Sequence, residues 1–213
     1  TATRREFLKR SAVVAAAAPL AGASTAWTAE QPSAAANAFD RKIKLGLIGC
    51  GGRGSWLADL FQKHGGYVIH AVADYFADLA DKAGERLGVD KARRFSGLAG
   101  HQRLLDSGVE AAVVVNVPRF HAEHGRAAVE AGCHVYAAKP VAIDVPGALK
   151  VQAAGKLATQ KKVCYLVDYQ LPTDPVNIEV VKRVHEGGLG RLAHIDSIGF
   201  SPPWAEPPVA SAE

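Results

Sequence analysis

The sequence predicts an α/β protein, a doubly wound parallel sheet followed by the truncated start of an α+β second domain. Three observations support this. Short, continuous apolar runs alternate with helix-like segments from residue 41 onward. The first run leads directly into a glycine-rich turn. The alternation stops near residue 167, and the length of 213 residues suits one domain and a fraction of a second.

The expected elements follow one another without a fixed repeat. Short, largely apolar runs are typical of strands buried on both faces, and they occur at residues 43–48, 67–73, 111–117, 134–138 and 163–167. Helical spacing, with a cap before it or a glycine after it, occurs at residues 55–63, 76–87, 121–131 and 144–160. Strands that alternate with helices in this way predict a parallel sheet with helices on both faces.

The first 26 residues have the three parts of an export signal. A charged start with paired Arg4 and Arg5 precedes a short, alanine-rich apolar run, and small residues follow. The arginine pair resembles the twin-arginine signal, which an export machinery reads. The sequence therefore predicts a periplasmic or otherwise exported protein. The run is too short for a stable membrane anchor. The alternative is an amphipathic N-terminal helix or a disordered tail.

Composition excludes several classes of protein. Of the formal charge of +4, +3 lies in residues 1–26, so no basic stripe remains for nucleic acid. Cys50, Cys133 and Cys164 lack C-x-x-C spacing, which excludes a disulfide framework and a cysteine zinc site. We interpret all three as small buried residues. Residues 27–40 are predicted to be a flexible linker, or an arm that packs on another subunit.

The glycine-rich turn fits the G-x-G-x-x-G pattern of dinucleotide-binding domains, between a strand and a helix. Its residues are Gly49, Cys50, Gly51, Gly52, Arg53 and Gly54. The first glycine permits the turn, the second leaves room for the pyrophosphate, and the last lets the helix pack on the strand. The helix N-terminus then faces the phosphates. Arg53 either contacts a phosphate or points into solvent. The alternative to a binding loop is a merely tight turn.

An acid at the end of the second strand favours NAD as the cofactor. Asp74 follows the loop by about twenty residues, the spacing of the carboxylate that binds the adenine-side ribose. This carboxylate would repel the 2′-phosphate of NADP. Tyr75 and Phe76 supply no cation to pair with that phosphate, so NADP is the less favoured cofactor. The alternative role for Asp74 is a helix N-cap.

Several motifs, in the right order and spacing, resemble the Gfo/Idh/MocA family, which includes glucose–fructose oxidoreductase and inositol dehydrogenase. They are Asn116-x-Pro118-x-x-His121, Ala131-Gly132-x-His134-Val135, Lys139-Pro140, Tyr169-Gln170 and Asp174-x-x-Asn177. The resemblance covers about residues 42–200. It implies an NAD(P)-binding Rossmann domain over residues 41–167. It also implies an incomplete C-terminal domain for substrate binding and oligomerisation over residues 168–213, and a homo-oligomer when the protein is full length.

The family's chemistry is a hydride transfer between a sugar or polyol hydroxyl and the nicotinamide. The resemblance makes Lys139 the catalytic residue, because a lysine beside the reacting hydroxyl polarises its oxygen and helps to move its proton. The alternative is an exposed loop lysine. The other residues that the resemblance places near the cofactor are Asn116, Pro118, His121 and Pro140. With Lys139, the expected substrate contacts are Tyr169, Gln170, Asp174 and Asn177.

The chain departs from the family pattern at three positions. Ala138 stands where the family's E-K-P motif has glutamate, Asp168 where many relatives have glycine, and Gln170 where many have arginine. His121 and His124 are three residues apart on a helix, but no third ligand is suggested, so no metal site is predicted. The resemblance places His121 near the cofactor and His124 on the surface.

The end of the sequence leaves its function open. A helix at 175–186 and a strand at 192–200 are expected, but two strands and a helix cannot bury both faces of a sheet. The chain is therefore a fragment of a longer protein, which we favour, or a degenerate copy. Three functions remain. They are an exported NAD-dependent oxidoreductase for a sugar or polyol, an enzyme that uses bound NAD transiently to cleave a glycosidic bond, and a non-catalytic dinucleotide-binding module.

Overall fold

The structure is a computed structural model that describes residues 39–169, 171–196 and 198. The predicted export signal, most of the connector, Gln170 and Phe200 lie outside these residues. Within the described part, no helix has the length and apolar character that crossing a bilayer requires.

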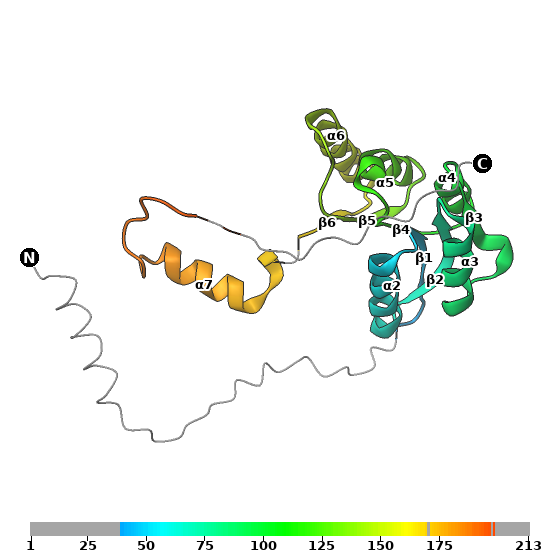
Figure 1. Ribbon diagram of the computed structural model, residues 1–213, viewed down its shortest axis with the longest axis horizontal. Helices are drawn as coiled ribbons and strands as arrows, with labels where there is room; N and C mark the ends of the chain where they lie inside the picture. Colours follow the sequence, from blue (N-terminus) through cyan, green and yellow to red (C-terminus); the bar gives the residue numbers. More distant parts are fainter. Residues whose placement is uncertain (1–38, 170, 197, 199–213) are drawn as a thin grey trace, which may run out of the picture. The chain divides into compact units, whose positions relative to one another are not determined.

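A six-stranded, fully parallel sheet forms the centre of the fold (Figure 1). Its strand order is β3-β2-β1-β4-β5-β6, so the chain starts in the middle and winds outward in both directions. This is the doubly wound order of a Rossmann fold. The strands are β1 (Ile43–Ile48), β2 (Tyr67–Asp74), β3 (Arg94–Ser96), β4 (Ala111–Val114), β5 (His134–Ala138) and β6 (Tyr165–Asp168).

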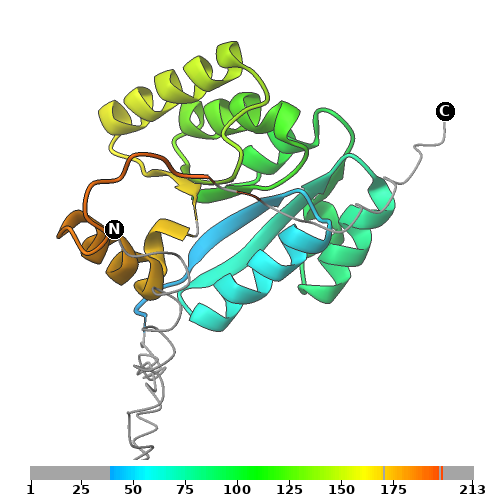
Figure 2. The same cartoon turned by 60° about the vertical axis from the view of Figure 1, so that its left-hand side comes forward.

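Helices cover both faces of the sheet (Figure 2). One face packs against α2 (Gly52–His64) and α3 (Ala77–Arg86). The other packs against α4 (Gly100–Leu105), α5 (His121–Glu130) and α6 (Val145–Lys161). Each face has its own apolar cluster, as a three-layer α/β architecture requires.

From Leu45 onward, strand β1 has only apolar residues and glycine on both of its faces. Leu45 and Leu47 pack with α2 and α3, whereas Ile48 belongs to the cluster on the opposite face. Gly46 points to that second face, where a Cβ would overlap the side chain of Leu104 from α4. Successive side chains of a strand point to opposite faces, so a central strand is apolar or small wherever helices cover both faces.

The five strands predicted for the sheet are confirmed, with shifted ends. The run at 111–117 ends as a strand at Val114, since Val115 makes one last bond to Ile48 and Pro118 then starts the 3₁₀ helix η2 (Pro118–Phe120). The last strand begins two residues late, at Tyr165. The first helix begins at Gly52, three residues earlier than expected, because its first turn is built from the glycine loop.

The stretch between α3 and β4 holds elements that the sequence did not predict. These are the 3₁₀ helix η1 (Lys91–Arg93), strand β3 and helix α4. Strand β3 has three residues and α4 has six, so neither is long enough to show an apolar period. Helix α4 matters for the site described below, because it carries His101.

Beyond the sheet, the expected helix is present and the expected strand is not. Helix α7 (Pro175–His185) follows the 3₁₀ helix η3 (Leu171–Thr173), and Asp174 caps α7. The strand predicted at 192–200 is wrong over its described residues, since residues 192–196 and 198 are not in a strand. A strand needs a hydrogen-bonding neighbour, and the described residues provide none for this segment.

Candidate functional site

A cavity of about 400 Å³ opens at the carboxyl ends of β1, β2 and β4. Strands β2 and β4 lie on opposite sides of β1, so the chain order reverses at this point, and parallel sheets bind ligands at such a position. The lining includes the glycine loop, Asp74 and several flat or apolar side chains. Lining residues that the sequence analysis did not connect with the site include Leu79, Leu98, His101, Phe120 and His124.

The glycines of the loop have separate roles in the geometry. Gly49 has a φ of 106°, which favours glycine, and a Cβ there would lie 2.6 Å from the backbone nitrogen of Asn116. A Cβ on Gly54 would overlap the carbonyl oxygen of Gly49. Gly51 lines the cavity and has no atom within 4 Å of an added Cβ. Gly49 and Gly54 are therefore required by the fold, whereas Gly51 leaves space for a ligand.

Cys50 is a buried, unreactive member of the loop. Its backbone N–H donates to Asp74 Oδ2 at 2.7 Å. Burial, with a smaller contribution from the Asp74 charge, raises the pKa of the Cys50 thiol to about 12, so it stays protonated and a poor nucleophile. Cys133 is also buried, as predicted, but Cys164 is exposed, which corrects the prediction of three buried thiols.

Asp74 supports the glycine loop from the end of β2. Its second oxygen, Oδ1, accepts the backbone N–H of Phe76 at 3.0 Å. The alternative role as the N-cap of the next helix is wrong, because Phe76 holds the cap position of α3. Asp74 also lines the cavity, so its carboxylate can still accept hydrogen bonds from a ligand with its remaining lone pairs.

Replacing Asp74 should change the choice between NAD and NADP. We expect Asp74→Asn to weaken NAD binding about tenfold, since a charge-assisted hydrogen bond contributes about 1.5–3 kcal/mol. NADP binding should weaken less or improve, because the repulsion of a 2′-phosphate disappears. Calorimetric titration with both dinucleotides checks this. An unchanged NADP-to-NAD affinity ratio would show that Asp74 only supports the loop.

The Arg53 side chain is partly exposed, with 35% of its surface accessible. Its guanidinium forms an ion pair with Asp168 at the end of β6, and it lies 5.2 Å from the ring centroid of Trp56. Asp168 is buried and also accepts a hydrogen bond from Tyr136. Burial, and then the charge of Asp168, raises the pKa of Tyr136 to about 12. A buried carboxylate requires such partners, so the ion pair orients the guanidinium, and contact of Arg53 with a phosphate stays a prediction.

His121 connects two loops that the sequence analysis assigned to the cofactor. It is the first residue of α5 and is almost fully buried. Its Nδ1 lies 2.8 Å from the carbonyl oxygen of Pro140, and its Nε2 lies 2.8 Å from that of Asn116. The imidazole thus fixes the Lys139–Pro140 segment relative to the end of β4.

Lys139 follows β5 at the same end of the sheet as the glycine loop. Its side chain is exposed and forms no hydrogen bond or ion pair with any described residue, and the peptide bond to Pro140 is cis. Ala138, which replaces the family's glutamate, is buried. Lys139 is therefore free to meet a substrate above the strand ends, and its catalytic role stays a prediction.

His124 is not the surface residue that the resemblance implied. It is 7% exposed, lines the cavity, and stacks on His101 with the ring centroids 3.9 Å apart. Its Nδ1 accepts from Asn116 Nδ2 at 3.0 Å. The amide oxygen of Asn116 is buried without a partner among the described residues. This contact could not be predicted from the sequence, because α4, which carries His101, was not predicted.

Burial of His124 should make the fold less stable in acid. Burial, followed by the charges of His101 and His121, lowers the pKa of His124 from 6.5 to about 4. As the pH falls below 6.5, His124 therefore becomes protonated in the unfolded chain while it stays neutral in the folded chain. The contribution of neutral His124 to the free energy of unfolding should be fully present above pH 6.5. By pH 4 it should have fallen by about 3 kcal/mol.

Urea unfolding of the parent and of His124→Phe, at a series of pH values, measures this contribution. The variant lacks the titrating group, so its free energy of unfolding should fall less between pH 6.5 and 4. Other groups titrate alike in both proteins and cancel in the difference. Parallel pH curves for the two proteins would contradict the assignment.

The predicted substrate residues lie on the segment that follows β6. Tyr169 is exposed. Asp174 accepts the backbone N–H groups of Val176 and Asn177, and Asn177 donates to the carbonyl oxygen of Leu171. Asp174 and Asn177 thus stabilise the start of α7, which a capping aspartate commonly does. Their contact with a substrate, and that of Gln170, remain predictions.

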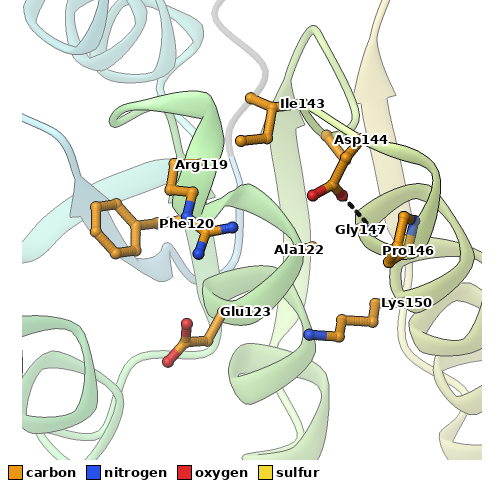
Figure 3. A pocket seen from close by; sticks show the side chains of 10 residues that line it. Arg119, Phe120, Ala122, Glu123, Ile143, Asp144, Pro146, Gly147 and Lys150 are labelled. Atoms are coloured by element: carbon orange, nitrogen blue, oxygen red, sulfur yellow. Dashed lines mark hydrogen bonds between the residues drawn. The ribbon is translucent and has the colours of Figure 1, made fainter.

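A second hollow of about 150 Å³ lies between the start of α5 and the start of α6 (Figure 3). Phe120 is the residue it shares with the larger cavity. Arg119 and Lys150 line it together with Glu123, and Asp144 at its rim accepts the Gly147 N–H at 2.7 Å as the cap of α6. Among the described residues, no group of three or more His, Cys, Asp or Glu side chains is placed to hold a metal ion.

Comparison with known proteins shows relatives of this fold and site. Residues 43–169 match the Gfo/Idh/MocA family, described as an oxidoreductase family with an NAD-binding Rossmann fold. A myo-inositol dehydrogenase, Hyg17, of Streptomyces leeuwenhoekii is 30% identical over 163 residues, which are 76% of this chain and 47% of that protein. A glycosyl hydrolase family 109 protein of Shewanella sp. (strain ANA-3) is 29% identical over 90% of this chain and 44% of that protein.

The solved structures agree with the architecture. KijD10, a 3-ketoreductase from Actinomadura kijaniata in complex with NADP and TDP-benzene, superimposes with a TM-score of 0.56 at 25% identity. The match covers 69% of this chain and 43% of that one. The chain thus spans about half the length of the curated relatives it matches. The fold, the glycine loop at the strand ends and the match over residues 43–169 together show that this chain belongs to the Gfo/Idh/MocA oxidoreductase family.

Proposed function

We propose that the protein is an NAD-dependent oxidoreductase that transfers a hydride between a sugar or polyol hydroxyl and the nicotinamide. The observation that carries this proposal is the cavity at the glycine loop. Gly51, with open space at its Cβ position, and Asp74, with a carboxylate at the rim, both line it. A pyrophosphate needs the first feature and a ribose diol needs the second.

The charge pattern of the cavity supports NAD rather than NADP. The lining holds one carboxylate, Asp74, and no Lys or Arg. Arg53, the cation in the glycine loop itself, is paired with Asp168. A 2′-phosphate would therefore meet a negative charge without a compensating cation. KijD10 was solved in complex with NADP, which describes the cofactor of that protein alone. The preference of this chain between NAD and NADP is tested by Asp74→Asn.

The roles of the chain's own residues follow from the placement of the two loops. NAD, when bound, supplies the group that accepts the hydride. The glycine loop binds its phosphates through backbone N–H groups at the start of α2. Lys139, exposed at the end of β5, would bind the substrate oxygen and move its proton, while His121 holds the backbone beside it.

A second candidate is a glycosidase that uses bound NAD transiently. The observation in its favour is that several relatives are named glycosyl hydrolase family 109 proteins, one of them matching 90% of this chain. Oxidation at one sugar carbon acidifies the neighbouring C–H, so the leaving group can depart before the hydride returns. Such a reaction cleaves its substrate without net formation of NADH, whereas the oxidoreductase accumulates NADH.

Two measurements test the proposal. Native mass spectrometry of the purified protein should show an adduct with the mass of the dinucleotide, or one formed on adding NAD. An apo-only spectrum in excess NAD would reject the binding function. Absorbance of the reduced nicotinamide, followed with a panel of sugars, polyols and aryl glycosides, then separates the two reactions. The oxidoreductase gives rising absorbance, and the glycosidase gives release of the aryl group without it.

We also propose that the protein is exported by the twin-arginine route and that it forms a homo-oligomer when full length. Support for export comes from the sequence of the first 26 residues, in which Arg4 and Arg5 are paired. The double substitution Arg4→Lys and Arg5→Lys should shift the protein from the periplasm to the cytoplasm. Fractionation of cells that express the parent and the double variant measures this shift. Equal distribution of parent and double variant would reject the route.

A further inference from the structure

Two buried imidazoles and a phenyl ring form a stack in the wall of the cavity. His101 from α4 and His124 from α5 are each 7% exposed, and both line the cavity. Their ring planes are 22° apart and their centroids 3.9 Å apart. Phe120 continues the stack at 5.5 Å from His124. This stack belongs to the same cavity as Gly51 and Asp74.

Each imidazole has a protein partner on one nitrogen only. His101 Nδ1 lies 3.0 Å from the carbonyl oxygen of Leu98. A carbonyl only accepts, so this nitrogen carries the proton and Nε2 of the neutral ring has a lone pair. His124 Nδ1 lies 3.0 Å from the amide nitrogen of Asn116, which only donates. His124 Nδ1 therefore accepts, and the proton of this neutral ring is on Nε2.

The two Nε2 atoms are available to a ligand. Neither has a hydrogen-bond partner among the described residues, and neither is among the fully enclosed polar atoms. His101 thus offers an acceptor and His124 a donor, and both residues line the cavity.

The pattern matches the edge of a 6-aminopurine. Adenine has an exocyclic amine that donates, next to a ring nitrogen that accepts. A 6-oxopurine has an acceptor in place of that amine. The surrounding lining includes the apolar side chains of Leu98 and Val117, and such side chains suit the faces of a planar base.

We propose that His101 and His124 form the base-recognition site of this cavity and make it selective for adenine over 6-oxopurines. His101 Nε2 accepts from the 6-amino group, and His124 Nε2–H donates to the neighbouring ring nitrogen. This inference rests on the proposed function, because the adenine is that of the dinucleotide held at the glycine loop. The two histidines would then determine specificity for the base, although the sequence pattern did not connect them with the cofactor.

The test compares NAD with nicotinamide hypoxanthine dinucleotide, which differs by an oxygen in place of the 6-amino group. In calorimetric titrations of the parent at neutral pH, NAD should bind about tenfold more tightly than the hypoxanthine dinucleotide. This is the expected effect of the one or two hydrogen bonds that the hypoxanthine ring cannot form. The variant His101→Phe keeps an aromatic ring in the stack and removes the acceptor. Its preference for NAD should fall to about twofold or less.

A matched control is His64→Phe, which changes a histidine at the end of α2 that does not line the cavity. It should keep the parent's preference. Equal binding of the two dinucleotides to the parent, or an undiminished preference in His101→Phe, would overturn base recognition by the pair and leave dinucleotide binding intact. A parent that binds neither dinucleotide would reject the proposed function itself.

A second measurement does not depend on how the variant folds. In the ¹⁵N-histidine-labelled parent, the Nε2 resonances of His101 and His124 should both shift on addition of NAD. They should not shift with nicotinamide mononucleotide, which lacks the adenosine half. Unmoved Nε2 resonances at saturating NAD would overturn the proposal.

Discussion

Gly54→Ala should strongly destabilise the chain. An added Cβ would overlap the carbonyl oxygen of Gly49, and it would also lie close to Val115, which is partly buried in the packing of α2 on the sheet. Backbone atoms cannot yield as the end of a flexible side chain can. We expect a loss of about 3 kcal/mol, the upper end of the cost of overpacking. Urea unfolding, followed by circular dichroism, measures it.

Gly51→Ala is the matched control within the same loop. An added Cβ there has no atom within 4 Å, and the φ of −67° suits alanine. Gly51 is the N-cap of α2, where alanine is less suitable, so we expect a loss of about 1 kcal/mol or less. Affinity for NAD should nevertheless fall strongly, since the methyl group would occupy the space for the pyrophosphate. Similar stabilities for the two variants would contradict the separation of roles.

Lys139→Ala, made in the full-length protein, should lower turnover strongly and leave cofactor binding unchanged. The side chain is exposed and has no partner among the described residues, so its removal costs the fold little. A positioned acid–base group contributes about 10²–10⁴-fold to a rate. We therefore expect the rate of NADH formation, with any sugar or polyol that the parent oxidises, to fall at least about a hundredfold. The dissociation constant of NAD should stay within about twofold.

The control for Lys139 is Lys156→Ala, on the exposed face of α6. It removes the same charge at a distance from the strand ends, so turnover should match the parent. A Lys139→Ala variant with parental turnover would show that the family's role for this lysine does not apply here. A variant that lost NAD affinity as well would place Lys139 in the cofactor site rather than beside the substrate.

The sheet and the cofactor loop were predictable because their causes are local. The apolar run from Ile43 leads directly to the glycines, and the Asp74 position follows from one strand and one helix. The doubly wound parallel arrangement also follows from the alternation of elements, whereas the edge strand β3 was not predicted. Pattern and period were sufficient for these features.

What the sequence did not reveal depends on contacts between distant segments. Arg53 and Asp168 are 115 residues apart, and nothing in the loop indicated which partner the guanidinium would find. His101 and His124 meet because α4, with six residues, lies against α5. The strand expected at 192–200 shows the opposite error, because β-propensity alone does not form a strand without a neighbour.

The strand order has a consequence for synthesis on the ribosome. Strand β1 is made first, yet it pairs with β2 on one side and with β4 on the other. Until residue 114 has been made, one edge of the most buried strand stays unpaired, and such an edge associates readily with other chains. A nascent chain stalled between β2 and β4 is therefore the stage most prone to aggregation, and it is the stage at which a chaperone would be most useful.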